Sequence, residues 1–204
     1  MSTPLVVAFL GDRDSSAQLS RLVQSPAATV VAVALDLGNG QALAELKAAA
    51  LAAGAARCHA LDVRDEFVRA AVLPASRRRT AGERSEAFAG LSAAFVAHTV
   101  RGIAEIEKGR YEAAEGVAGW SRVVRPALAG PATMALTVEG GEPVALNDIA
   151  MTPSELVDSL ETIAGMPALE VFHQVFRELD GADIGQVILR AHDGACTVQS
   201  AVTV

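Results

Sequence analysis

Residues 4–16, PLVVAFLGDRDSS, decide how the rest of the chain is interpreted. They begin with a continuous apolar run, residues 4–11, that ends in glycine, as buried parallel strands often do. A polar turn follows, and apolar residues at helical spacing then predict a short helix over residues 15–25. A strand, a turn and a helix start form a generic anion site, because free N–H groups and the helix dipole favour phosphate. The alternative is that Asp14 or Ser15 only caps the helix.

The same alternation of strand and helix continues. Residues 28–38 and 56–63 have the pattern of two further buried strands. Between them, residues 40–54 are rich in alanine and leucine and end at Gly54, which is typical of a helix with a C-terminal glycine cap. Strands joined by helices over short connections predict an α/β fold with a parallel, doubly wound sheet.

The middle of the chain is mainly helical. Residues 64–75 are predicted to be helical until Pro74, and residues 83–108 carry one broad apolar face that predicts a long core-facing helix. Residues 109–116 are a candidate for a further strand. Residues 117–131 break the pattern and indicate a loop or a domain boundary.

The last third of the chain predicts a small α+β unit. Residues 133–147 read as strand, Gly-Gly turn and strand, and residues 185–204 read as a second hairpin that turns at Asp193-Gly194. A helix over residues 152–165 has a complete capping pattern, and an amphipathic helix follows over residues 169–179. We therefore expect a nucleotide-binding-like α/β domain at residues 1–131 and an α+β domain at residues 132–204.

Composition limits the classes of partner. The chain has 204 residues, of which 51% are hydrophobic and 20% charged, and its net charge is −7. Such an acidic protein is a poor general binder of nucleic acid. The run Arg77-Arg78-Arg79 is a local exception. We interpret it as a solvated loop, with a site for phosphate or an acidic partner as the alternative.

Cysteine usage and the N-terminus indicate a cytoplasmic protein. Cys58 and Cys196 are the only cysteines and lie in apolar contexts, so buried free thiols in a reducing compartment are expected. No signal peptide is predicted at the start, and no apolar stretch reaches the length that spans a membrane. The four histidines are scattered without metal-ligand spacing, and no metal site is predicted.

Asp12 makes the opening turn unusual. It places a carboxylate where a phosphate would bind, and two unit charges about 4 Å apart cost roughly 4 kcal/mol at an effective dielectric constant near 20. Arg13 could offset part of this repulsion. A residue with a Cβ is also expected to be strained in a turn that needs a positive φ. A tight triphosphate site is therefore less expected than a weakened or repurposed one.

Residues 8–16, AFLGDRDSS, resemble the A-Y-S-G-G-L-D-T-S pyrophosphate loop of the argininosuccinate synthase family. Residues 30–75 are similar, in order, to the family's A-D-[IL]-G-Q, L-G-A, D-x-[RS]-x-E-F and P-A segments. Residues 141–165 resemble its G-x-P-V-x-[LV]-N…S-x-L-E-L…L-N-x-I-A-G stretch. The resemblance implies an adenine-nucleotide alpha-hydrolase-like fold of the pyrophosphate-loop type. It also implies an enzyme that joins citrulline and aspartate by way of a citrulline-adenylate made from ATP.

The resemblance assigns a few candidate site residues and no catalytic residue. Ser92 matches a substrate-contacting serine of the family. The candidate nucleotide-binding residues are those of the loop together with one position on the second strand and one near the end of the first domain: Gly11, Asp14, Ser15, Ser16, Leu35 and Gly116.

Several family positions are altered. Asp12 replaces a glycine of the loop, Ala87 stands at the position of a tyrosine that contacts citrulline, and Phe95 stands at that of an arginine. Residues 115–123 resemble H-G-A-T-G-K-G-N-D but lack its His, Thr, Lys, Asn and Asp. Full-length family members are considerably longer, and most of their second domain is expected to be missing here between Gly130 and Thr133 and again near residues 168–184.

Three hypotheses follow. The first is a relative of argininosuccinate synthase without ligase activity that acts as a binding, regulatory or structural protein, as a homodimer or with another protein. The second is a reduced ATP-binding module or an enzyme with altered chemistry. The third is an active synthase completed by a partner chain. Neither nucleic acid nor a membrane is expected as a partner.

Overall fold

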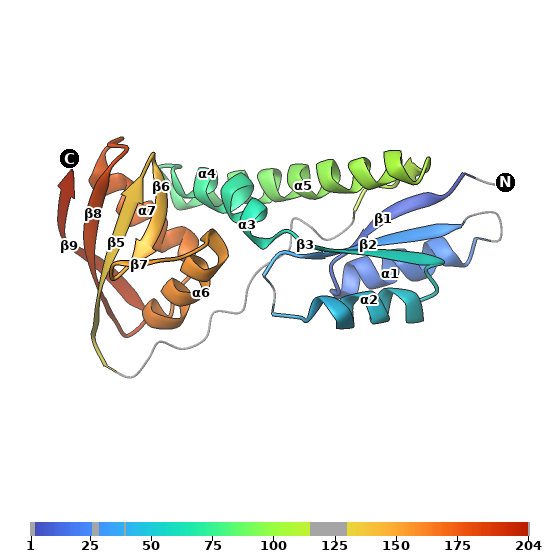
Figure 1. Cartoon of the computed structure of the whole chain (residues 1–204), viewed down its shortest axis with the longest axis horizontal. Helices are drawn as coiled ribbons and strands as arrows, with labels where there is room; N and C mark the ends of the chain where they lie inside the picture. Colours follow the sequence, from blue (N-terminus) through green and yellow to red (C-terminus); the bar gives the residue numbers. More distant parts are fainter. Residues whose placement is uncertain (1–2, 26–28, 39, 115–129, 204) are drawn as a thin grey trace. The chain divides into compact units, whose positions relative to one another are not determined.

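The computed structural model describes residues 3–25, 29–38, 40–114 and 130–203. It divides the chain into two compact units, each with its own sheet (Figure 1). Unit 1 comprises Met1–Arg64 and Ala89–Ser121, and unit 2 comprises Asp65–Phe88 and Arg122–Val204. The boundary predicted between residues 131 and 132 lies beside residues 115–129, which are outside the described part, and stays a prediction.

Unit 1 contains a parallel four-stranded sheet, which confirms the predicted α/β class. Its strands are β1 (Leu5–Phe9), β2 (Val30–Asp36), β3 (Arg57–Asp62) and β4 (Arg110–Tyr111), in the order β3-β2-β1-β4. β1 and β2 form the centre of the sheet, and nearly all of their residues are buried. Both faces of these strands are therefore covered, as their continuous apolar sequence predicts.

Helices cover both faces of this sheet. α1 (Arg13–Val23) and α2 (Leu43–Ala52) lie together on one side, and the part of α5 (Ala81–Ile106) that starts at Ala89 runs along the other side (Figure 1). Below β1 and β2, Leu19 and Leu46 join one apolar cluster with the strand side chains. The helices predicted over residues 15–25 and 40–54 are confirmed, each with bounds shifted by two or three residues.

The strand order reverses at β1. The chain passes from β1 outward through β2 to β3, and β4 later pairs with the opposite edge of β1. Ligands of open α/β sheets bind at such a switch point, outside the carboxyl ends of the strands. Here the segments after β1 and β4 meet, and the Gln18 side chain of α1 donates a 2.5 Å hydrogen bond to the Ala113 carbonyl. The turn that follows β1 therefore lies where a ligand site is expected.

The helix predicted to end at Pro74 continues past it, and that prediction is wrong. Three helical segments follow one another: α3 (Arg64–Phe67), the π-helix η1 (Val68–Val72) and α4 (Leu73–Ser76). In the widened π turn, the Leu73 N–H donates to the Val68 carbonyl. Pro74 then falls in the first turn of α4, where a missing N–H is tolerated.

Unit 2 contains a five-stranded antiparallel sheet in the order β7-β6-β5-β8-β9. Its strands are β5 (Ala132–Glu139), β6 (Glu142–Leu146), β7 (Ile149–Ala150), β8 (Gly185–His192) and β9 (Ala195–Thr203). Both predicted hairpins are confirmed, with two-residue turns at Gly140-Gly141 and Asp193-Gly194. All four turn residues have positive φ angles, 58°, 77°, 51° and 72°, as such turns require.

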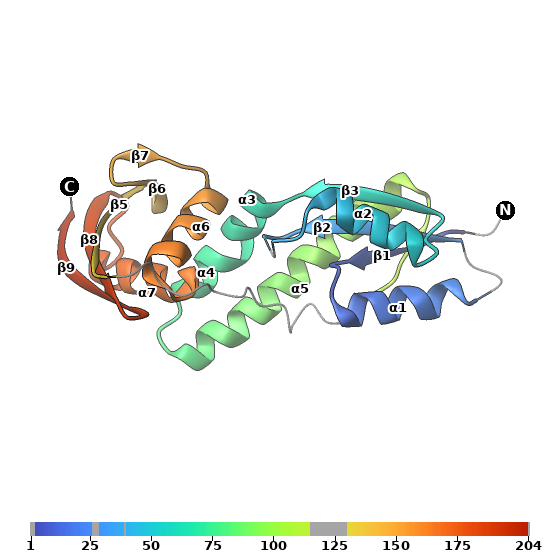
Figure 2. The ribbon, with the colours of Figure 1, turned by 90° about the horizontal axis from the view of Figure 1, so that it is seen from below.

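Two helices pack on this sheet. α6 (Pro153–Ala164) and α7 (Ala168–Leu179) contact each other and lie beside the strands (Figure 2). The predicted capping pattern is confirmed: Thr152 and Glu155 form a reciprocal capping box, and Gly165 ends α6 in the left-handed conformation. Phe172 and Val175 of α7 are fully buried, so the α+β core of unit 2 is built as predicted.

One described helix, α5, is long and apolar enough to cross a membrane by length and composition. The expectation that no apolar stretch reaches that length therefore meets one candidate, by length and composition only. The finding is weak evidence for a membrane, because core helices of soluble proteins pass the same test. On α5, Val96, Val100 and Ala104 recur every fourth residue and are buried, which is the pattern of a helix that packs on a protein core.

Candidate functional site

The turn after β1 is closed by its own aspartate. Asp12 is the N-cap of α1, and its Oδ1 accepts a 2.8 Å hydrogen bond from the Ser15 N–H. The prediction that Asp14 or Ser15 caps this helix is therefore wrong. Asp12 has φ −83° and ψ 175°, an extended conformation open to any residue, so the expected backbone strain at Asp12 is also wrong. The positive φ of this turn falls on Gly11 instead.

Ser15 is used inside the turn. Its side chain is buried, with a relative exposure of 1%. Its hydroxyl accepts from the Leu10 N–H at 3.2 Å and donates to the Asp12 carbonyl at 3.4 Å. Ser15 therefore binds the end of β1 to the start of α1, and both its backbone and side-chain groups serve the turn itself.

Gly11 is required by its surroundings. Its φ is +75°, and a Cβ added there would lie 2.1 Å from Oε1 of Gln41 and 2.4 Å from Cδ2 of Leu46. The Gln41 side chain therefore lies directly against the turn. Together, Asp12 and Gln41 place a carboxylate and an amide at a turn that would otherwise be open to a phosphate.

The structure brings four of the predicted residues together. Gly11 precedes α1, while Asp14, Ser15 and Ser16 form its first turn. Asp14 is exposed and Ser16 is half-buried, so both side chains reach solvent at the end of β1. This cluster is the candidate site that the sequence predicted.

The remaining predicted residues are not all at this turn. Leu35 lies one strand away, near the end of β2, and its side chain is fully buried. Ser92 lies on α5 and is fully buried, and its Oγ has no hydrogen-bond partner within the described part of the chain. Gly116 lies outside the described residues.

A second polar cluster lies at the carboxyl ends of β2 and β3. Oδ1 of Asp36 accepts from the Gly38 N–H at 2.8 Å. Arg64 donates to Asp62 at 2.9 and 2.8 Å, and its Nε lies 3.6 Å from Oδ2 of Asp36. These bonds from Arg64 hold the pKa of Asp62 below its ordinary value. The signal was present in the sequence as a carboxylate at the end of each strand.

A phosphate group at this turn would meet the Asp12 carboxylate. The N–H of the third residue of α1 already donates to that carboxylate, so a phosphate would have to displace it or lie beside it. At about 4 Å, the repulsion is roughly 4 kcal/mol per pair of unit charges at an effective dielectric constant near 20. Within residues 3–25, 29–38, 40–114 and 130–203, no group of three or more His, Cys, Asp or Glu side chains could hold a metal ion that offsets this charge.

Both cysteines are free thiols. Cys58 is half-buried and Cys196 is buried. Burial raises the pKa of each thiol above its ordinary value, so both are protonated near neutral pH. Their local environments favour structural over nucleophilic roles.

Comparison with known proteins agrees with the parallel α/β fold of unit 1. The family model described as "Arginosuccinate synthase N-terminal HUP domain" matches residues 4–122. Proteins named argininosuccinate synthase from Syntrophobacter fumaroxidans, Dictyoglomus turgidum and Desulfatibacillum aliphaticivorans are 44%, 31% and 38% identical over 73, 80 and 73 residues. These matches cover 36%, 39% and 36% of this chain but only 18%, 20% and 18% of the relatives. The matched region thus spans about a fifth of each relative.

Proposed function

Since the chain belongs to the argininosuccinate synthase family, we propose that it keeps the nucleotide-binding fold of that family without its ligase activity. It acts as a binding, regulatory or structural protein. The observation that carries this proposal is the 2.8 Å hydrogen bond from the Ser15 N–H to the Asp12 carboxylate. The turn that would bind the phosphates of ATP is stabilised by a negative charge of the chain itself.

The altered positions support the same proposal. The resemblance places a tyrosine at position 87 and an arginine at position 95, where this chain has Ala87 and Phe95. Ser92, the substrate-like residue that survives, is fully buried on α5. An alanine and a phenylalanine cannot donate the hydrogen bonds that an amino-acid substrate needs for orientation.

A second candidate function is ATP binding without ligation. The intact Gly11 and the N-terminus of α1, where Arg13 and Asp14 are exposed, favour it, because a helix N-terminus at the end of a parallel strand attracts anions. An active synthase completed by a partner chain is the third candidate. It requires that chain to supply the missing substrate-binding groups.

Release of AMP separates these candidates. The purified chain is incubated with ATP, magnesium, citrulline and aspartate, and AMP is measured by chromatography. The proposal predicts no AMP release above a reaction without protein. Release that depends on both citrulline and aspartate would contradict it and would favour the third candidate.

Cellular location and assembly belong to the same proposal. The two free thiols support a cytoplasmic protein. A homodimer, or a complex with another protein, is the proposed assembly, and light scattering at micromolar concentration tests it. A monomer that captures no protein partner would contradict this part of the proposal.

A further inference from the structure

The segment Arg77-Arg78-Arg79, between α4 and α5, is held in place by a buried arginine. The guanidinium of Arg84 donates to the carbonyls of Arg78 and Arg79 at 3.4 and 3.2 Å. Its other bonds run to Glu170 of α7, at 3.1 and 2.6 Å. The Arg84 side chain is only 7% exposed, so this anchor lies inside unit 2.

Arg77 is fixed as well. Its guanidinium lies 4.0 Å from the centre of the Phe176 ring and donates to the Gly141 carbonyl at 2.5 Å. A cation over an aromatic face and a bond to a carbonyl both restrict a long side chain. Arg77 therefore supports the segment, while Arg78 and Arg79 remain exposed on a fixed backbone.

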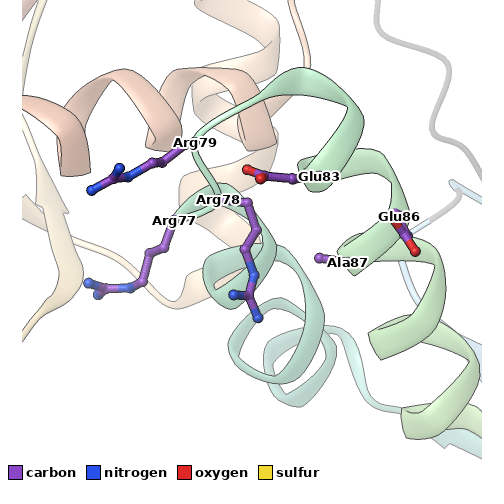
Figure 3. Close-up of a pocket in the computed structure, with 6 residues that line it drawn as sticks. All are labelled: Arg77, Arg78, Arg79, Glu83, Glu86 and Ala87. Atoms are coloured by element: carbon purple, nitrogen blue, oxygen red, sulfur yellow. The ribbon is translucent and has the colours of Figure 1, made fainter.

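These arginines line a surface hollow of about 590 Å³ with Glu83, Glu86 and Ala87 of α5. Figure 3 shows that Arg77 and Arg79 extend toward one side and Arg78 toward another. The three guanidinium groups therefore do not all point toward the same side. An extended chain with several carboxylates can reach them one after another.

Of the nearby carboxylates, Glu83 is held mainly by the backbone at the start of α5, and the charge of Arg78 also acts on it. Glu83 accepts from the Thr80 N–H at 3.0 Å, and the Glu83 N–H donates to Oγ1 of Thr80 at 3.2 Å. This capping box directs Glu83 to the start of α5, and the bond from the Thr80 N–H holds the pKa of Glu83 below its ordinary value. Figure 3 shows Glu86 pointing away from the arginines.

We propose that Arg78 and Arg79, on the segment anchored by Arg84, are the docking site for an acidic peptide segment of a partner protein. Guanidinium groups bind carboxylates through two parallel N–H bonds, and a fixed backbone lowers the entropy cost of binding. The chain carries a net charge of −7, and Arg77-Arg78-Arg79 is its one run of three consecutive basic residues. This goes beyond the function proposed above, because every residue of the docking site belongs to unit 2 and none to the Asp12 turn.

Fluorescence anisotropy with a labelled oligoglutamate peptide at low ionic strength tests the proposal. The wild-type chain is expected to bind the peptide saturably and to lose binding as salt is added. The double variant Arg78→Gln/Arg79→Gln should weaken binding about tenfold, as expected for two exposed charged contacts. Arg190→Gln, which removes one arginine charge at an exposed position of β8, is the control and should leave the affinity unchanged.

Two further measurements complete the test. Arg84→Lys should also weaken peptide binding, because it keeps the charge but loses the anchor of the segment. Asp12→Gly should not change peptide binding, because Asp12 lies in the turn after β1 and not in the docking site. Equal weakening by Arg190→Gln and by the double variant, or binding of an oligoglutamine peptide as tight as that of oligoglutamate, would overturn the proposal. So would tighter binding of a labelled single-stranded RNA that depends on the same arginines.

Discussion

Replacing Arg84 by methionine tests whether the buried ion pair with Glu170 stabilises unit 2. The variant loses two charged hydrogen bonds to Glu170 and two bonds to backbone carbonyls. Breaking a buried pair by removing one partner costs about 3–5 kcal/mol. Since the side chain of Glu170 is 33% exposed and can be partly rehydrated, we expect a loss of about 2–3 kcal/mol in the free energy of unfolding.

The assay is guanidinium chloride unfolding followed by circular dichroism. Arg177→Met is the matched control, because Arg177 pairs with Glu178 on the surface, where the two side chains are 64% and 39% exposed. Exposed pairs contribute about 0–1 kcal/mol, so this control should unfold near the wild-type midpoint. Equal midpoints for Arg84→Met and Arg177→Met would refute the reasoning that the Arg84 anchor is structural.

Three other substitutions have distinct expected outcomes. Gly11→Ala should lower stability by about 1–3 kcal/mol in thermal unfolding, because its Cβ would overlap Gln41 in a turn with positive φ; a wild-type melting temperature would contradict this. His59 and then Arg57 hold the pKa of Glu107 below that of a free glutamate, about 4.3. The stability that Glu107 contributes is thus present above that pH and lost as pH falls through the lower folded-state pKa, so Glu107→Gln should flatten the acid side of the stability profile. Ser92→Ala should leave stability unchanged or raise it by up to about 1 kcal/mol, because it removes a buried hydroxyl without a described partner; a clear loss measured by chemical unfolding would show that the hydroxyl is bound.

Features set by neighbouring residues could be predicted from the sequence. The capping box of α6 depends on Thr152 and Glu155, three residues apart, and the first hairpin of unit 2 depends on two adjacent glycines. Such signals act over one turn of chain, so tertiary packing has little influence on them. The parallel sheet could also be predicted, because buried strands and helices alternate over short connections.

The capping of α1 in the turn after β1 could be predicted only in part. The sequence placed Asp12 in the turn, but three residues within four positions, Asp12, Asp14 and Ser15, can cap a helix. The choice depends on where β1 ends and on the Leu10 N–H, which donates to the Ser15 hydroxyl. Helix bounds are uncertain by one or two residues from sequence, which is enough to assign the wrong cap.

Contacts between distant residues could not be predicted. Arg84 and Glu170 are 86 positions apart, and Gln41 meets Gly11 only because α2 returns beneath β1. No local pattern marks such pairs before the chain is folded. The passage of the helix through Pro74 also depends on a π turn, which lets Val68 accept from Leu73.

Calorimetric titration with ATP and magnesium tests the central claim most directly. The wild-type chain should show no saturable binding at millimolar ATP. Asp12→Gly removes the carboxylate at a capping cost of a few tenths of a kcal/mol and should bind up to about a thousandfold tighter, since roughly 4 kcal/mol of repulsion is lost. Asp12→Asn keeps a side-chain oxygen for the cap without the charge and should fall between the two. Saturable binding by the wild type as tight as by Asp12→Gly would contradict the claim that the Asp12 carboxylate disfavours phosphate binding at the turn after β1.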